Sequence, residues 1–373
     1  MHAPLRVIEL IDVREGGVVE HARERAELAH ALHRDCMAWG PLALMQPLMP
    51  ALDRLARSWF ARSCSPYTGE IEAVAATLGF SGTWFLNGSY QWGCTALARE
   101  ERGAPWLART LDWPLPGMGR NVDVAHMRGA AGDFYNVTWP GYVGVLTAMA
   151  PGRFAAAINQ APLRRRSHWR ALRFPDIALN AVNTWRHVRH IPPDQLLRQV
   201  FETCGSFAEA RAQLETVPVA RPVIYTLVGC APSERCVIER TEEGGRTRSE
   251  RACAANDWEV GDPRYEARLG ARKVFTSTYA EAAANSRERS EAVAGWQGTF
   301  ARDSFAWVAS PVLNRYTRLA VEICPAEGIL RVVGYETQRG VDLPRPATAR
   351  AEWRVGHHDT RLTSHPTKRL QLS

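Results

Sequence analysis

The chain has 373 residues, of which 46% are hydrophobic, so it can bury a large core without disulfides or a metal ion. No stretch approaches the ~20 apolar residues of a membrane span, and the N-terminus lacks the apolar core of a secretory signal. These features exclude an integral membrane protein and predict a cytoplasmic one. The net charge is +7, and among the basic residues only Lys273 and Lys368 are lysines. This bias toward arginine is explained better by GC-rich coding than by binding of polyanions.

The eight cysteines are scattered and form no Cys-x-x-Cys or paired Cys/His spacing, so we expect reduced thiols, no zinc site and no cofactor. The densest basic run, Arg164-Arg165-Arg166 with Trp169 nearby, could face a phosphate group or an anionic membrane surface. A solvated loop is the simpler interpretation. We therefore expect no nucleic-acid partner and leave a weak contact with a membrane surface open.

The first 93 residues predict a helical leader segment. Apolar residues recur at helical spacing from Val18 to Cys36 and again from Leu52 to Phe60. A third helix is predicted from Glu70 to Leu78, with Thr68 as its N-cap and Gly79 as its C-cap.

From Cys94 onward, short strand-like runs alternate with turn signals, then helical patterns follow and strands return. The order predicts an α+β fold in which two antiparallel sheets stack and helices cover their outer faces. We assign 94–343 to this catalytic domain and 344–373 to a loosely ordered tail. The predicted strands are 94–98, 106–111, 134–139, 142–149, 154–158, 223–228, 236–239, 249–254, 305–309, 317–324 and 329–335, and the predicted helices are 175–188, 194–204, 206–214 and 263–285.

The candidate chemistry lies at Cys94 because of the hairpin that follows it. A turn centred on Arg102-Gly103 would bring Cys94 opposite about Leu111 in an antiparallel pair. Arg109 and Asp112 would then flank the sulfur. On spacing alone, the alternative is an ion pair at a strand end beside an inert buried thiol.

A cysteine becomes a good nucleophile when a base takes its proton and a cation stabilises the thiolate. In a chain cleaved before Cys94, the freed α-amine, with a reference pKa near ~7.7–8.0, could be that base, and Asp112 could orient the ammonium. Arg109 supplies the positive charge. These residue types allow nucleophilic catalysis by Cys94, although their spacing alone favours the ion pair beside an inert thiol.

Several segments carry a resemblance to a known family. They are Gly93-Cys94-Thr95-Ala96-Leu97 with Ala108-Arg109-Thr110-Leu111-Asp112-Trp113, residues 139–147, residues 222–229 with 236–240, Ala255-Asn256-Asp257-Trp258, and Arg268-Leu269-Gly270-Ala271. In this order, over residues 65 to 335, they resemble the acid ceramidase and N-acylethanolamine acid amidase group of cysteine N-terminal-nucleophile (Ntn) hydrolases, which is related to choloylglycine hydrolases. The resemblance implies the Ntn-hydrolase αββα sandwich.

The resemblance also implies roles for the matching residues. Autocatalytic cleavage of the Gly93-Cys94 bond would make Cys94 the N-terminal nucleophile and its α-amine the base, with Asp112 holding the amine and Arg109 bracing the pair. Residues 1–93 would then be a propeptide-like leader whose cleaved fragment remains bound.

Two further residues receive roles from the resemblance. Asn256 would offer its side-chain amide to the oxyanion, and Arg268 would support the site by charge. The sequence departs from the family at Gln160, where the relatives have a glutamate linked to self-processing, and at Asp257-Trp258, which replaces a Tyr-Asp pair.

We therefore expect an enzyme that hydrolyses a small-molecule N-acyl amine through an acyl-cysteine intermediate. The alternatives are an acyltransferase that uses the same intermediate, and an uncleaved, non-catalytic binding or structural protein. Aromatic residues near the site favour an apolar acyl group, although they could equally build a core; they are Trp92, Trp113, Trp139 and Phe134. The identities of the acyl group and the amine, and the oligomeric state, stay open.

Overall fold

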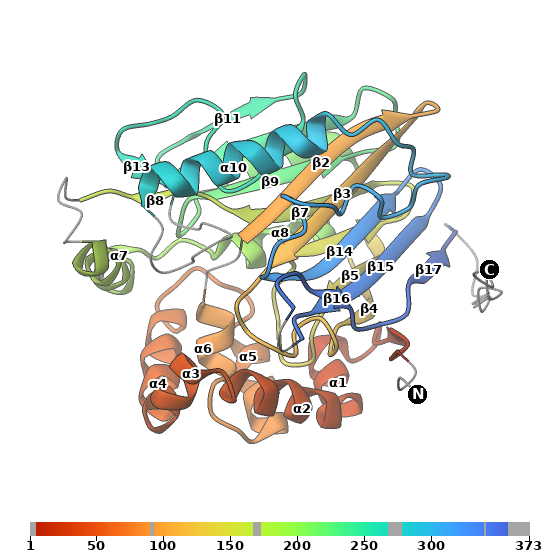
Figure 1. Cartoon of the computed structure of the whole chain (residues 1–373). Helices are drawn as coiled ribbons and strands as arrows, with labels where there is room; N and C mark the ends of the chain where they lie inside the picture. Colours follow the sequence, from red (N-terminus) through yellow and green to blue (C-terminus); the bar gives the residue numbers. More distant parts are fainter. Residues whose placement is uncertain (1–4, 90–92, 167–172, 268–277, 339–340, 357–373) are drawn as a thin grey trace.

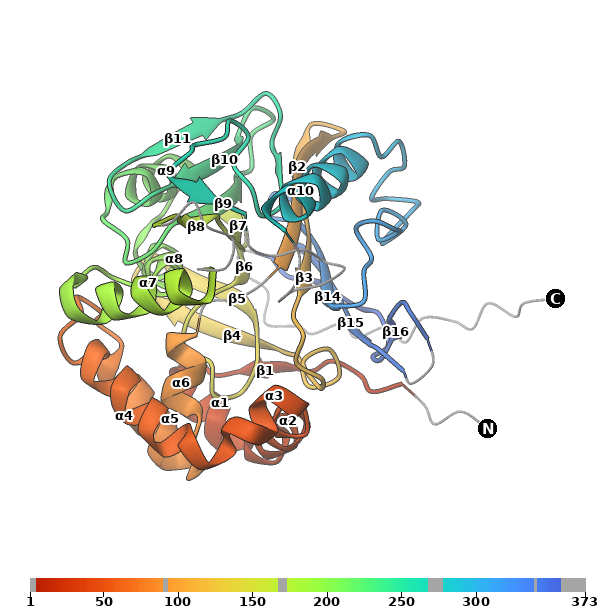
Figure 2. The ribbon, with the colours of Figure 1, turned by 60° about the vertical axis from the view of Figure 1, so that its left-hand side comes forward.

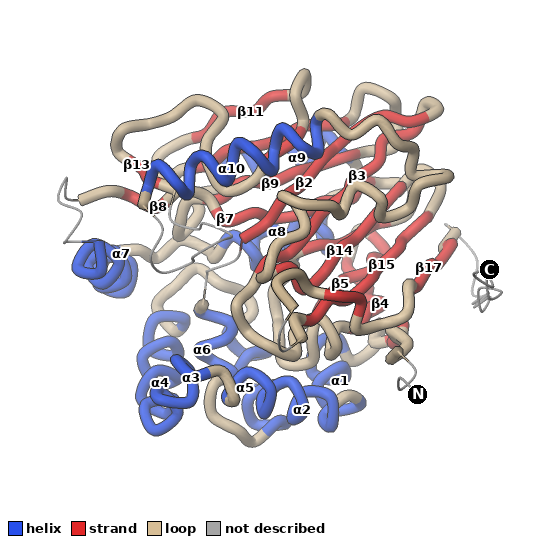
Figure 3. The backbone as a smooth tube through the Cα atoms, in the orientation of Figure 1, coloured by secondary structure: helices blue, strands red, loops and turns tan. Residues whose placement is uncertain are grey.

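The computed structural model describes residues 5–89, 93–166, 173–267, 278–338 and 341–356, with the backbone alone for 173–178. Two β-sheets lie face to face, and helices from the first 90 residues form a group at one end of the molecule (Figure 1). Figure 3 shows the strands as inner layers with helices outside them.

The leader is helical apart from one strand. β1 (Leu10–Asp12) pairs in parallel with β4 (Asp123–Gly129) of the following domain, which corrects the purely helical leader that the sequence predicts. The predicted helix before Gly79 is confirmed as α5 (Thr68–Leu78), and the φ of 69° at Gly79 is the left-handed conformation of a glycine C-cap. The predicted N-cap is wrong, because Thr68 lies inside the helix and Tyr67 is the N-cap residue. The other leader helices are α1 (Gly17–Glu24), α2 (Ala26–Met37), α3 (Gly40–Met45), a 3-10 turn (Gln46–Leu48), α4 (Met49–Phe60) and α6 (Thr83–Gly88).

The larger sheet has eight strands in the described part of the chain, and all of its pairs but β1 with β4 are antiparallel. Every residue of its central strand, Val223–Val228, is buried, because the sheet is covered on both faces. The order is β1, β4, β5 (Gly132–Thr138), β6 (Thr147–Ala150), β7 (Phe154–Gln160), β9 (Val223–Val228), β10 (Arg235–Arg240) and β11 (Gly245–Arg248).

The smaller sheet carries the hairpin with Cys94. Its order is β12 (Cys253–Ala254), β2 (Gly93–Glu101), β3 (Ala104–Asp112), β14 (Thr317–Cys324), β15 (Ile329–Glu336) and β16 (Arg345–Pro346), and β17 (Ala351–Arg354) also pairs with β15. A separate short pair joins β8 (Leu163–Arg164) to β13 (Tyr265–Glu266).

β16 and β17, which pair with β15, correct the loosely ordered tail that the sequence predicts from residue 344 for its first part, whereas residues 357–373 lie outside the described residues. Ala351, Trp353 and Val355 alternate with polar residues and pack against the main core, so the segment has the period of a half-buried strand.

The two sheets stack through β2 and β3 of the smaller sheet and β7 and β9 of the larger one. α8 (Pro193–Thr203) and α9 (Phe207–Thr216) cover the larger sheet, whereas α10 (Tyr279–Ala294) lies on β2 and β12 on the opposite side (Figure 2). α7 (Arg173–His187) docks on α4, where the Trp59 indole donates to the carbonyl oxygen of Thr184 at 3.2 Å. The αββα sandwich is thus confirmed. No helix in the described ranges is long and apolar enough to cross a membrane.

Several predicted elements are misplaced. Residues 142–146 form no strand, and β4 and β11 were not predicted. The helix predicted over 263–285 is only partly correct: Tyr265–Glu266 is a strand, residues 268–277 lie outside the described ranges, and α10 begins after a capping box at Thr278 and continues past Asn285. The strand predicted over 305–309 is also wrong, because this segment wraps around the buried carboxylate of Glu322, to which Phe305 N–H and Trp307 Nε1 donate at 2.6 and 2.8 Å.

Candidate active site

The β2–β3 hairpin places Cys94 as the sequence predicts. Arg102 and Gly103 have φ angles of 53° and 80°, the two positive values of a type I′ turn. This turn sets the register, in which Cys94 pairs with Leu111 and Gly93 pairs with Asp112.

The register puts Arg109 and Asp112 on opposite faces of the hairpin. Cys94 and Arg109 point between the two sheets, because residues that are paired or two apart share a face. Asp112 points to the other face, toward α10. The expectation that both residues flank the sulfur is therefore correct for Arg109 and wrong for Asp112, which lies on the backbone side of residue 94.

The sulfur of Cys94 lies in a buried, positively charged setting. Arg109 Nη2 donates to Cys94 Sγ at 3.2 Å and to the carbonyl oxygen of Ile158 at 3.1 Å, and the thiol itself lies 3.6 Å from that oxygen. Arg109 is fully buried, and its Nε and Nη1 have no hydrogen-bond partner in the described part of the chain. A buried guanidinium with so few acceptors is a ready source of positive potential for a thiolate.

The thiol of Cys94 is shielded and protonated. The exposed fraction of Cys94 is 0%. Burial raises the pKa of the Cys94 thiol, and the nearby Arg109 guanidinium acts in the opposite direction. The sulfur thus needs both a base and access before it can attack a substrate.

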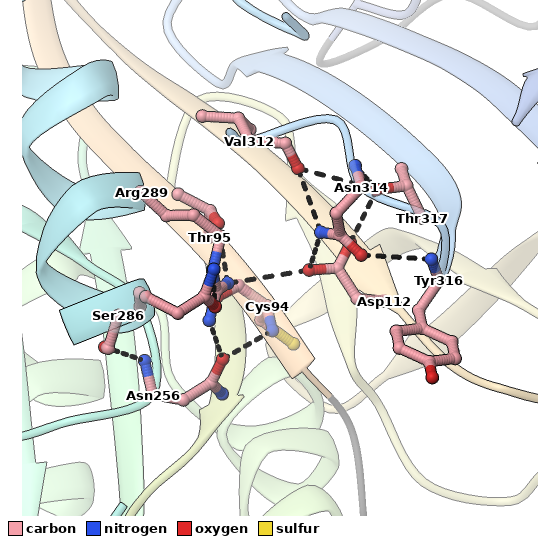
Figure 4. A network of polar contacts seen from close by, with 12 residues as sticks. Cys94, Thr95, Asp112, Asn256, Ser286, Arg289, Val312, Asn314, Tyr316 and Thr317 are labelled. Carbon is pink, nitrogen blue, oxygen red and sulfur yellow. Dashed lines mark hydrogen bonds and ion pairs between the residues drawn. The ribbon is translucent and has the colours of Figure 1, made fainter. Parts of the chain in front are cut away.

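The backbone of Cys94 is held by two side chains from distant segments (Figure 4). Its N–H donates to Asn256 Oδ1 at 3.0 Å, and its carbonyl oxygen accepts from Arg289 Nη1 at 2.6 Å. Asn256 Nδ2 donates in turn to the carbonyl oxygen of Gln160 at 2.9 Å. The fold therefore brings Asn256 to Cys94, but in the uncut chain its oxygen, not its amide nitrogen, faces that residue.

Arg289 is the member of the site that the sequence analysis missed. Its guanidinium is 1% exposed and donates to Asn256 Oδ1 at 2.8 Å and Thr95 Oγ1 at 2.9 Å, with Asp112 Oδ2 at 3.5 Å. Burial lowers the pKa of Arg289, while the Asp112 carboxylate raises it. Arg268, for which a supporting charge was predicted, lies outside the described residues, so that role stays a prediction.

A cavity of about 470 Å³ lies beside the start of β2. Trp113, which directly follows Asp112, lines it together with Gly88 and Ser89 at the end of the leader. One wall is apolar and consists of Trp39, Leu42, Phe85, Trp113 and Leu115, and the polar lining comes from Arg164, Arg166, Asn180, Asn183, Arg221 and Glu242.

A smaller cavity of about 80 Å³ shares Leu42, Phe85, Trp113 and Leu115 with that wall, and most of its other lining residues belong to the leader. Of the aromatic residues predicted near the site, Trp113 lines both cavities. Trp139 and Phe134 are core residues instead, with exposed fractions of 2% and 0%, and Trp92 lies outside the described residues. Among the described residues, no group of three or more His, Cys, Asp and Glu side chains could hold a metal ion.

The structure thus places a cysteine at the start of a strand in an αββα sandwich, beside a buried arginine and asparagine, as the resemblance to cysteine Ntn hydrolases implies. No family model matches the chain. The N-acylethanolamine-hydrolyzing acid amidase of Oryctolagus cuniculus is 29% identical to it over 192 residues, which cover 48% of this chain and 49% of that protein.

A probable acid ceramidase of Caenorhabditis elegans is 24% identical over 226 residues and 54% of each chain. The chain thus matches only about half the length of these curated relatives. Among solved structures, the Caenorhabditis elegans N-acylethanolamine-hydrolyzing acid amidase ortholog has 15% identity and a TM-score of 0.45, covering 62% of this chain and 93% of its own. The relatives confirm the resemblance to the acid ceramidase and N-acylethanolamine acid amidase group.

Proposed function

We propose that the chain is the precursor of a cysteine amidase that cleaves its own Gly93-Cys94 bond and then hydrolyses N-acyl amines through an acyl-cysteine intermediate. The observation that carries the proposal is the contact of 3.2 Å between the Arg109 guanidinium and the sulfur of Cys94. Arg109 is buried, and its Nε and Nη1 have no hydrogen-bond partner among the described residues. The curated relatives, an acid amidase and a probable acid ceramidase, support the same class of reaction.

Self-cleavage begins with an N-to-S acyl shift. Cys94 Sγ attacks the carbonyl carbon of Gly93, the C–N bond breaks, and the nitrogen of residue 94 takes up the thiol proton and becomes a free amine. Water then hydrolyses the thioester, which leaves a carboxylate on Gly93 and restores the thiol. Gly93 has no side chain in the path of the sulfur, and a Cβ there would lie 3.1 Å from Asp112 Cβ.

In the cleaved protein, the α-amine of Cys94 takes the thiol proton and the thiolate attacks the amide carbon of the substrate. Arg109 stabilises the thiolate, and Asn256 Nδ2 donates to the oxyanion after its side-chain amide turns from the carbonyl oxygen of Gln160. The ammonium returns its proton to the leaving amine as the C–N bond breaks. Water hydrolyses the thioester and releases the acid.

The cavity beside β2 suits the acyl group of the substrate. Its volume of about 470 Å³ lies in the range of small-molecule sites, and most of its apolar wall also lines the smaller cavity. Because Leu42 and Phe85 belong to that wall, the leader has to remain bound after cleavage. The pairing of β1 with β4 and the contacts of Arg6 and Arg25 with the buried Asp123 support such retention.

The test is a mass measurement followed by an activity panel. We expect the incubated protein to yield fragments 1–93 and 94–373 and to hydrolyse at least one N-acylethanolamine, ceramide or N-acyl amino acid. The Cys94→Ala variant should do neither, whereas the Cys253→Ala variant, which removes another buried thiol, should do both. A wild-type chain that stays intact and inactive would show a non-catalytic protein, and transfer of the acyl group to added amine faster than to water would show an acyltransferase.

A further inference from the structure

Asp112 is held by an element of the chain that the mechanism above does not use. Its Oδ2 accepts a hydrogen bond from Asn314 Nδ2 at 2.8 Å, and its Oδ1 accepts one from Thr317 Oγ1 at 2.8 Å (Figure 4). Asn314 is 8% exposed and Thr317 is 0% exposed. Each carboxylate oxygen thus has its own neutral donor, so the carboxylate plane is fixed independently of Arg289.

The donors are themselves ordered by hydrogen bonds within residues 312–317. Asn314 N–H donates to Thr317 Oγ1 at 3.0 Å, and Tyr316 N–H donates to Asn314 Oδ1 at 3.0 Å. Asn314 Nδ2 also donates to the carbonyl oxygen of Val312 at 3.1 Å. The two side chains therefore have a set orientation before they meet the carboxylate.

A β-bulge aims this element at Asp112. Thr317 pairs with Asp112 and Leu319 pairs with Leu111, so Arg318 is the extra residue between them. Arg318 is anchored by a hydrogen bond of 2.9 Å from its Nε to the carbonyl oxygen of Leu115. Directly paired residues share a face of the sheet, and the bulge thus places the Thr317 hydroxyl on the face of the carboxylate.

We propose that Asn314 and Thr317 are positioning residues that hold the Asp112 carboxylate aimed at the α-amine that cleavage creates on Cys94. Asp112 pairs with Gly93, so it lies beside the nitrogen of the next residue. A carboxylate that is fixed by two donors orients the ammonium without reorganisation. The inference rests on the proposed function, because the amine exists only after cleavage.

The experiment compares three variants of the full chain after cleavage. Thr317→Val removes the hydroxyl and keeps the shape, and Thr317→Ser keeps the hydroxyl. Thr110→Val is the matched control. Thr110, on β3, is fully buried like Thr317, but its hydroxyl has no partner in the described part of the chain. The readouts are kcat, KM and the pH profile of N-acyl amine hydrolysis, together with the unfolding temperature.

For Thr317→Val we expect kcat to fall about 10- to 100-fold, with KM within about twofold, because a hydrogen bond to a charged group is lost. The pH profile of kcat should change as well, because the α-amine of Cys94, which is the base of the proposed reaction, loses its fixed partner. Thr317→Ser and Thr110→Val should keep the wild-type profile.

An active wild type with Thr317→Val indistinguishable from Thr110→Val overturns the positioning role and leaves the proposed function intact. A wild type that hydrolyses no N-acyl amine overturns both. If the Thr317→Val protein does not fold, Asn314→Ala, which keeps the Thr317 hydroxyl, carries the same expectations.

Discussion

We predict that the buried guanidinium of Arg109 is needed for the reaction but contributes little to the free energy of unfolding, and the Arg109→Met variant tests this. Two of its nitrogens, Nε and Nη1, have no partner in the described part of the chain, and each such donor costs about 1–3 kcal/mol. The hydrogen bonds from Nη2 to Cys94 Sγ and to the Ile158 oxygen return about 1.5–3 kcal/mol each. Since these effects nearly cancel, the free energy of unfolding of the variant should lie within about 2 kcal/mol of the parent value. The rates of self-cleavage and hydrolysis should fall at least ~100-fold, because the cation is lost.

Stability is measured by urea unfolding of freshly purified chains that a mass measurement shows to be uncut, so that the sulfur of Cys94 is present in every protein. Arg331→Met is the matched control: Arg331 is also buried, but it contacts Glu322 at 3.1 Å and Glu352 at 2.9 Å. Its loss should cost about 3–5 kcal/mol. Our reading of Arg109 is refuted if its variant loses as much stability as the Arg331 variant, or if it still matures and turns over at the wild-type rate.

Three other predictions concern pH, the leader and the cavity. Burial raises the pKa of Asp194 from 3.8 to about 6, so between these pH values the folded chain holds a proton that the unfolded chain has released, and the free energy of unfolding should fall by up to about 3 kcal/mol as pH rises from about 4 to about 6. In urea unfolding at several pH values, Asp194→Asn should flatten this decrease, and an unchanged slope would contradict the prediction. Asp123→Asn should release fragment 1–93 from the cleaved protein on a sizing column, because Arg6 and Arg25 lose their shared carboxylate, and continued co-elution would argue against this anchor. Leu42→Asp should raise KM for long acyl chains about tenfold or more and leave short ones nearly unchanged, whereas an equal effect on both would place the acyl group elsewhere.

The part of the site that lies on the hairpin could be predicted because its information is local. The Arg102-Gly103 turn sets the register of two strands, and the register brings Arg109 onto the face of Cys94. The same alternation puts Asp112 on the other face, and the sequence analysis erred there by counting distance along the strand without tracking the faces.

Arg289 could not be found in this way, because it reaches the backbone of Cys94 across 195 residues from a helix whose bounds were misplaced. A signal was present: Ala282, Arg289 and Val293 share one helical face and are all buried, so an arginine stands at a core position. Asn314 and Thr317 carry no such local signal, since the bulge at Arg318 that aims them depends on pairing with β3.

The geometry around residue 94 also explains how one site could serve both proposed reactions. Before cleavage the nitrogen of Cys94 is an amide that can only donate, and Asn256 Oδ1 accepts its hydrogen at 3.0 Å. After cleavage the same nitrogen is an amine, and in its protonated form it can still donate to that oxygen. Arg289 binds the carbonyl oxygen of Cys94, which is untouched by the cut, so residue 94 would keep its place while its nitrogen gains basicity. Maturation would thus create the base without rebuilding the site, and the buried thiol would attack no external substrate until that base exists.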